Sequence, residues 1–179
     1  MYVCAGESEQ FAFAEPIGIG LVDAAARLDH LCRTRSPESL HFVGTAGSYG
    51  DHALMQIVEV GAATQIETGF WRGDCYTPIE NRIVSSGNVS RETIVNSSNY
   101  ITTDPQAAAA FRAEGIGLEN MEFFAVLRIA QMHGIPAQGT LIVTNYCDAR
   151  AHEDFLAHRA EAMRRLEDYL RDKGALHTS

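Results

Sequence analysis

The chain has 179 residues, of which 46% are hydrophobic and 21% are charged. This length is close to that of one domain, and the composition excludes a largely disordered protein. We therefore expect a single domain over residues 1–179. The formal net charge is −9 and the basic residues are scattered until the last helix, which disfavours a nucleic-acid partner because such partners need clustered Lys and Arg.

The sequence predicts neither a membrane partner nor a secretory leader. No run reaches the roughly 20 apolar residues of a membrane-spanning helix, and Glu7 and Glu9 lie where a leader would be basic. We expect a cytoplasmic protein. The cysteines lack the spacing of a metal site, so no metal is implied, and we expect reduced thiols in small apolar sites. These are Cys4, Cys32, Cys75 and Cys147.

Short β-rich runs alternate with helical patterns along the chain, which is typical of an α/β fold with helices packed on the faces of a sheet. The expected strands are Tyr2 to Ala5, His41 to Val43, Leu54 to Val60, Ala63 to Thr68, Arg82 to Ser85 and Thr140 to Thr144. The expected helices are Leu21 to Arg33, Pro105 to Glu114, Glu119 to His133 and His152 to Lys173.

The sequence also predicts a long loop and an amphipathic last helix. Residues 69–80 are expected to form a long surface loop that contains Trp71, the only tryptophan. The last helix has an apolar side and a mixed-charge remainder, so we expect a solvated outer helix without a catalytic role. Its apolar side comprises Leu156, Met163, Leu166 and Leu170.

Small or polar residues follow four of the expected strands. In open α/β sheets, ligands bind beyond the carboxyl ends of the strands, so these segments predict a site for a polar ligand at one rim. Turns favour the same residue types, and each segment alone is better explained as a turn. The four together favour a site. They are residues 6–9, 44–48, 85–88 and 144–145.

The segment Ile17 to Gly20 superficially resembles a dinucleotide-binding loop. The third glycine of that fingerprint is missing, Asp23 stands in its place, and no strongly β run precedes it. We therefore interpret the segment as a close-packed loop that opens the following helix.

Glu122 is the most informative single residue. On a helical wheel it falls opposite the polar side, which contains Arg128 and Gln131, and beside Val126 and Ile129. A buried carboxylate needs a partner, because removing its charge from water without hydrogen bonds costs several kcal/mol. Glu122 either binds a ligand or a buried donor, or it lies in a first helical turn that favours acids through the helix dipole.

Taken together, these segments resemble the nucleoside phosphorylase and nucleosidase family, which includes purine nucleoside phosphorylase, methylthioadenosine/S-adenosylhomocysteine nucleosidase and futalosine hydrolase. The resemblance implies a three-layer α/β sandwich with a central mixed sheet, a shortened form of the family fold. It also implies an enzyme that cleaves the N-ribosyl bond of a purine-type nucleoside. The motifs occur in family order and are Gly18 to Ala25, Val43 to Gly47, Ser86 to Asn88, Asn120 to Glu122 and Leu141 to Asn145.

The resemblance also implies roles for individual residues. Met121 corresponds to a methionine that packs on the ribose, and Glu122 to a glutamate that accepts hydrogen bonds from its hydroxyls. Glu9 resembles the glutamate that deprotonates the attacking water, and Asn145 falls where nucleosidases carry an acid that protonates the base. Asparagine cannot supply a proton, so Asp148 is the candidate acid. The remaining substrate-binding candidates are Ile19, Ala46, Gly47 and Thr144.

The departures from the family pattern leave three functions open. The segment before the glycine motif is shorter than in the family. Ser90 lies near the position where nucleosidases have a phenylalanine that stacks on the base. His41 and Phe42 occupy the stretch where one phosphorylase branch has a phosphate-binding arginine. Hydrolysis is therefore favoured slightly over phosphorolysis, in which phosphate would be the co-substrate. The third alternative is a non-catalytic nucleoside-binding protein. No cofactor is implied, and the family resemblance implies a homo-oligomer.

Overall fold

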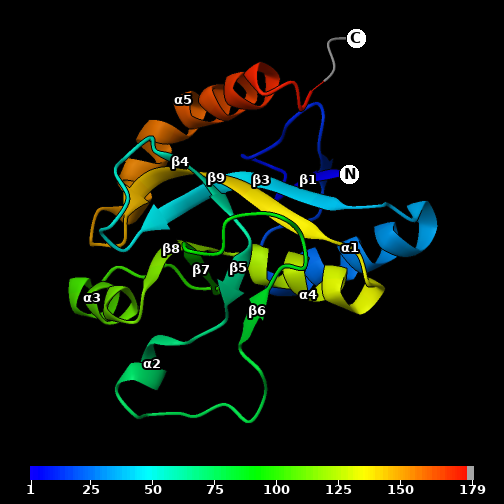
Figure 1. Ribbon diagram of the computed structural model, residues 1–179. Coiled ribbons are helices and arrows are strands. Elements are labelled where there is room, and N and C mark those ends of the chain that lie inside the picture. Colours follow the sequence, from blue (N-terminus) through cyan, green and yellow to red (C-terminus); the bar gives the residue numbers. More distant parts are fainter. Residues whose placement is uncertain (177–179) are drawn as a thin grey trace.

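The computed structural model, shown in Figure 1, describes residues 1–176. In that part of the chain the strands are β1 (Tyr2–Cys4), β2 (Glu15–Pro16), β3 (Leu40–Ser48), β4 (Ile57–Val60), β5 (Ala62–Thr64), β6 (Arg82–Val84), β7 (Ile94–Ser97), β8 (Ile116–Asn120) and β9 (Ala137–Tyr146). The helices are α1 (Leu21–Arg35), α2 (Thr68–Trp71), α3 (Pro105–Ala113), α4 (Phe123–His133) and α5 (Ala151–Asp172).

The strands form one mixed sheet in the order β2-β1-β3-β8-β7-β5-β6, with β9 paired to both β3 and β4. The neighbours β1 and β3, β3 and β9, and β7 and β8 are parallel. By contrast, β3 pairs with β8, and β4 with β9, in the antiparallel direction. The expectation of a central mixed sheet is confirmed.

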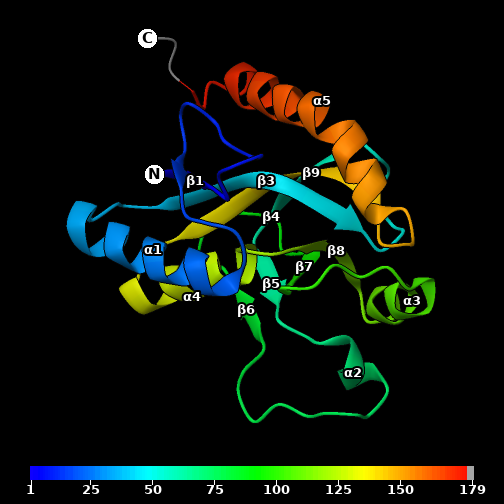
Figure 2. The same ribbon diagram turned by 180° about the vertical axis from the view of Figure 1, so that it is seen from behind.

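Helices cover both faces of the sheet, which gives three layers (Figures 1 and 2). Helix α5 lies over β9 and β3, whereas α1 and α4 pack together on the other face. Each interface has its own apolar cluster. Leu166 and Leu170 of α5 pack with Val43 and Ile142 of the sheet, and the larger cluster under α1 and α4 includes Leu28, Phe42, Phe123, Val126 and Leu141. The three-layer α/β fold is therefore confirmed.

The expected helices are all present, but one begins later than the sequence pattern indicated. We expected Glu119 to His133 to be helical, whereas residues 116–120 form strand β8 and the helix begins at Phe123. Gly115 adopts a positive φ of 73°, so the backbone reverses there and the following residues extend into the sheet. Strand β7 (Ile94–Ser97) was also missed.

One of the four segments expected at the rim lies elsewhere. Strand β6 runs antiparallel to β5, so residues 85–88 lie at the opposite ends of the strands from the rim. There Ser85 Oγ donates a hydrogen bond to the carbonyl of Ala137, at the beginning of β9. The segment that follows β7 takes their place at the rim, because β7 is parallel to β5 and β8.

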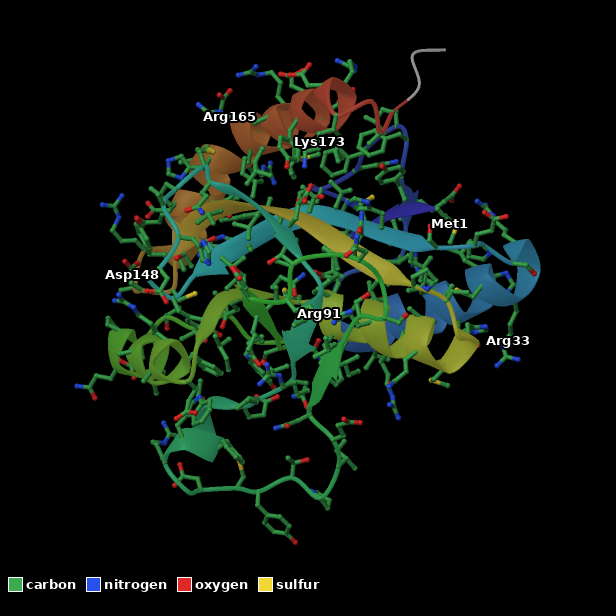
Figure 3. The ribbon with its side chains drawn as sticks, in the orientation of Figure 1. Met1, Arg33, Arg91, Asp148, Arg165 and Lys173 are labelled. Atoms are coloured by element: carbon green, nitrogen blue, oxygen red, sulfur yellow. The ribbon has the colours of Figure 1, made fainter. Side chains whose placement is uncertain are left out.

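Of the remaining expectations, the strand over Ala63 to Thr68 is wrong beyond Thr64, because Thr68 already begins helix α2. Residues 69–80 are mostly exposed, but they include part of the short helix α2, and Trp71 packs edge-on against Phe111. Three cysteines are buried free thiols, whereas Cys75 is exposed, contrary to expectation. Arg164, Arg165 and Asp168 of α5 are exposed, and Arg165 is labelled on the outer helix in Figure 3. Within residues 1–176, no helix combines the length and the apolar character needed to cross a membrane.

Candidate active site

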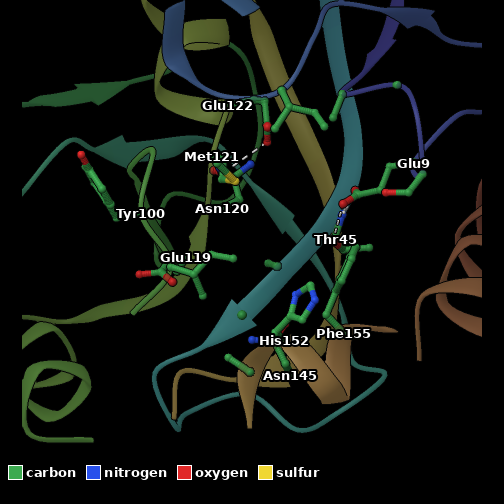
Figure 4. A pocket seen from close by; sticks show the side chains of 18 residues that line it. Glu9, Thr45, Tyr100, Glu119, Asn120, Met121, Glu122, Asn145, His152 and Phe155 are labelled. Carbon is green, nitrogen blue, oxygen red and sulfur yellow. Dashed lines mark hydrogen bonds between the residues drawn. The ribbon is translucent and has the colours of Figure 1, made fainter. Parts of the chain in front are cut away.

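A cavity of about 240 Å³ opens where the ends of β1, β3, β8 and β9 meet the segment after β7. Three glutamates line it, namely Glu9, Glu119 and Glu122, and we call it the acidic pocket (Figure 4). Among the described residues that line it, none is Lys or Arg. The pocket therefore holds three carboxyl groups and no Lys or Arg side chain among its described lining residues.

Glu122 is free to face the pocket because other side chains cap helix α4. Asn120 Oδ1 accepts a hydrogen bond from the amide of Phe123 at 3.2 Å, and Ser97 Oγ accepts one from the amide of Phe124 at 2.9 Å. Glu122 itself is the residue before the helix and makes no side-chain cap. The expectation that it lies on the apolar side within the helix is wrong, although its burial is confirmed.

The Glu122 carboxylate is held by backbone amides. Its Oε1 accepts a hydrogen bond from Gly20 N at 2.9 Å, and its Oε2 accepts one from Met121 N at 3.2 Å. Burial raises the pKa of Glu122 to about 7, assisted by the nearby charge of Glu9 and opposed by the two amides. Gly20 has a φ of 85°, which L side chains rarely adopt. The glycine motif thus shapes a turn whose amide binds Glu122.

Glu9 is fixed by a single residue on the other wall of the pocket. Its Oε2 accepts a hydrogen bond from Thr45 N and its Oε1 accepts one from Thr45 Oγ1, both at 2.8 Å. Desolvation raises the pKa of Glu9, while the two bonds from Thr45 lower it. A positioned carboxylate whose pKa is raised is suited to accept a proton from water.

Asn145 lies at the end of β9, and its amide is oriented by its neighbours. Thr144 Oγ1 donates to Asn145 Oδ1 at 2.9 Å, and Asn145 Nδ2 donates to the carbonyl of Tyr146 at 3.1 Å. Gly47 lies against this amide, since a Cβ built there would be 3.0 Å from Asn145 Nδ2 and 2.9 Å from Cys147 Sγ. The amide keeps one N–H and one lone pair for a ligand.

Glu119 is engaged by groups outside the pocket. Thr102 N donates to its Oε1 at 2.9 Å, and Tyr49 OH donates to its Oε2 at 2.7 Å. Thr102 Oγ1 also donates to Oε2. Since Thr102 follows Tyr100 and Ile101, which line the pocket, Glu119 holds that wall in place.

The structure brings together seven of the nine residues singled out from the sequence. Those that line the acidic pocket are Glu9, Ile19, Ala46, Gly47, Met121, Glu122 and Asn145. Thr144 is fully buried behind the lining, where it orients Asn145.

Asp148 does not line the pocket, so its expected role as the acid has no geometric support. Its Oδ1 accepts a hydrogen bond from Arg150 N at 2.8 Å, and its carbonyl accepts one from Ala151 N. Asp148 therefore stabilises the turn into α5, as short acidic side chains before a helix commonly do.

The lining residues that the sequence patterns missed include Glu119, Tyr100, His152 and Phe155. Tyr100 lies in the segment after β7, a strand that was not expected. His152 and Phe155 lie in the first turns of α5, and both project into the pocket in Figure 4. We assigned no catalytic role to α5 because of the mixed-charge pattern of the helix. The i, i+3 spacing places residues 152 and 155 on one face, but it does not indicate that this face lines the pocket.

Solved structures share this fold at low sequence identity. A futalosine hydrolase mutant from Helicobacter pylori matches with a TM-score of 0.81 and 14% identity, covering 95% of this chain and 95% of that chain. A mutant of the H. pylori 5'-methylthioadenosine/S-adenosylhomocysteine nucleosidase, with 5'-methylthioadenosine in the active site, matches with a TM-score of 0.77 and 16% identity. The match covers 89% of this chain and 78% of that chain.

A third structure, the Streptococcus pneumoniae MTA/SAH nucleosidase in complex with 8-aminoadenine, has a TM-score of 0.76 and 15% identity, covering 94% and 95% of the two chains. The sequence matches no curated protein. The sequence model of the phosphorylase superfamily matches residues 79–172, which is more than half of the chain. This chain therefore belongs to the phosphorylase superfamily.

Proposed function

We propose that the protein hydrolyses the N-ribosyl bond of a purine-type nucleoside in the acidic pocket. The observation that carries the proposal is the pair of glutamates on opposite walls, Glu122 bound by Gly20 and Met121, and Glu9 bound by Thr45. Superfamily membership supports it, as does the fold that the chain shares with solved nucleosidases and a futalosine hydrolase.

Cleavage of a ribosyl bond builds positive charge on the sugar and negative charge on the departing base. An acidic pocket stabilises the charge on the sugar. Glu122 and Met121 are adjacent on one wall, so Glu122 accepts hydrogen bonds from the ribose hydroxyls while the thioether packs on the ring. Glu9 takes the proton of the attacking water as general base.

The base occupies the opposite end of the pocket from Glu122 in this proposal. Asn145 offers one N–H and one lone pair there, which matches a 6-oxopurine such as the base of inosine. Tyr100, whose side chain is 76% exposed and which lines the pocket, provides an aromatic face for stacking. Together the two residues recognise the base by its edge and by its plane.

Water is favoured over phosphate as the nucleophile by the charges of the lining. Phosphate is an anion that needs a cationic partner, and no Lys or Arg is found among the lining residues in the described part of the chain. Each ionised glutamate in the same cavity would repel it. These charges make phosphorolysis the second candidate.

Base release from a nucleoside panel, measured with and without phosphate, tests the proposal. We expect release of free base and ribose at the same rate in both conditions. Strict dependence on phosphate with formation of ribose 1-phosphate would establish phosphorolysis instead. Nucleoside binding without turnover of any panel member would establish the non-catalytic alternative.

A further inference from the structure

Under the proposed function, the departing base needs a proton, and the side chains discussed so far do not supply one. Asn145 does not titrate, Asp148 lies outside the pocket lining, and Glu119 accepts hydrogen bonds from Thr102 and Tyr49. Glu9 is bound by Thr45, and Glu122 is bound by Gly20 at the ribose end of the pocket. A different donor is required at the base end.

His152 is the titratable side chain that the geometry leaves at that end. It lines the acidic pocket together with Asn145, and Figure 4 shows its imidazole directed into the cavity, at the end away from Glu122. Within residues 1–176 its ring nitrogens have no hydrogen-bond partner, unlike those of His41, His133 and His158. Imidazole is the side chain that most readily exchanges protons near neutral pH.

The backbone that carries His152 is held firmly. Asp148 fixes the turn before α5, and Ala151 is buried. Two turns further along the helix, His158 Nδ1 lies 2.7 Å from the carbonyl of Thr144, which joins α5 to β9 beside Asn145. His152 itself is exposed, so the ring can recover a proton from solvent between turnovers.

Resting on the proposed function, we infer that His152 is the general acid that protonates the departing purine. The C1′–N9 bond breaks, its electron pair passes to the base, and the imidazolium donates its proton to N7. Water adds to C1′ and gives its proton to Glu9. The products are free ribose and neutral base, and solvent returns Glu9 and His152 to their starting protonation states.

A comparison of two leaving groups tests this role. Inosine releases a base that needs a proton, whereas p-nitrophenyl β-D-ribofuranoside releases a phenolate that leaves without one. For His152→Gln we expect kcat on inosine to fall by about 100-fold, the low end of the usual effect of a general acid. The kcat on the p-nitrophenyl riboside should change by less than about threefold, because acid catalysis contributes nothing there.

The matched control is Glu153→Gln, which changes the next residue of α5, exposed and outside the pocket lining. It should leave both activities at the wild-type level. Unchanged inosine cleavage by His152→Gln would overturn the inference, and so would an equal loss on both substrates. If the wild-type protein cleaves no member of the nucleoside panel, the proposed function fails first, before any variant is compared.

Discussion

The carboxylate of Glu122 accepts a hydrogen bond from the amide of Gly20 at 2.9 Å, across 102 positions of sequence. This contact joins the turn before α1 to the residue before α4. Helices α1 and α4 pack side by side on the same face of the sheet, so the two turns meet at the same rim. The glycine turn and the acid therefore form one structural unit at the ribose end of the acidic pocket.

Glu122→Gln should abolish most nucleoside cleavage while leaving the fold intact. Glutamine keeps the shape and one acceptor oxygen, but it loses the charge that stabilises the hydroxyls and the positive sugar. Hydrogen bonds to charged groups contribute about 1.5–3 kcal/mol, so we expect kcat/KM to fall by roughly 10- to 100-fold. Steady-state kinetics and thermal unfolding measure the two properties. Wild-type activity in this variant would remove Glu122 from the site, and Glu38→Gln, on an exposed loop position, is the control.

The same carboxylate should make stability depend on pH. Burial raises the pKa of Glu122 from the ordinary 4.5 to about 7 in the folded protein. Between these two pH values the folded state holds a proton that the unfolded state has released. The free energy of unfolding therefore decreases as pH rises from about 4.5 through about 7. Urea unfolding of the wild type should show this loss between pH 5 and pH 8. Glu122→Gln should show a smaller loss over that range, and parallel curves for the two proteins would contradict it.

Thr45→Val tests whether Glu9 must be held on both oxygens. Valine removes the hydroxyl that donates to Glu9 Oε1 and keeps the amide that donates to Oε2. We expect kcat to fall by about 10-fold, because the loss of one hydrogen bond to a charged group leaves the base poorly oriented. KM should change little. Thr34→Val, whose hydroxyl bonds the His30 carbonyl on the exposed side of α1, is the control, and an equal effect in both would refute a specific role.

Much of this architecture is predictable from the sequence, because its signals are local. Helix α1 follows the glycine turn, and β9 contains the apolar run LIV at residues 141–143 within a strand that is buried along most of its length. Strand β8 is different. Its five residues contain one glycine and end in a glutamate and an asparagine, so no β-rich run marks them. Pairing with β7 and β3 makes it a strand, and that pairing is a tertiary effect.

The same limit applies to the site. Glu9, Glu122 and Asn145 could be found because they lie next to recognisable segments. His152 and Phe155 could not, because their place in the pocket depends on how α5 packs over β9 and β3. Tyr100 depends likewise on the contact between Thr102 and Glu119, two residues whose partnership no sequence spacing indicates.

Gly47→Ala should impair both stability and activity through steric contact. A Cβ at this position would lie 2.9 Å from Cys147 Sγ and 3.0 Å from Asn145 Nδ2. Overpacking of this kind costs about 1–3 kcal/mol, and relief by moving the Asn145 amide would misplace it for the base. Denaturant unfolding and nucleoside kinetics measure both effects. Gly69→Ala, where a Cβ would meet its nearest atom at an ordinary 3.5 Å, should leave both unchanged.

Tyr100→Ala should weaken nucleoside binding without affecting the fold. The ring is 76% exposed, so its removal creates no core cavity, yet it lines the acidic pocket. Stacking of a base on an aromatic side chain contributes about 1–3 kcal/mol, so KM or Kd should rise by roughly 5- to 150-fold. The control is Tyr76→Ala, which removes a ring that is 85% exposed and lies outside the pocket lining. If both variants bind inosine as tightly as the wild type, the base does not stack on Tyr100. A rise confined to Tyr100→Ala would instead place the plane of the base against the segment that Glu119 holds through Thr102.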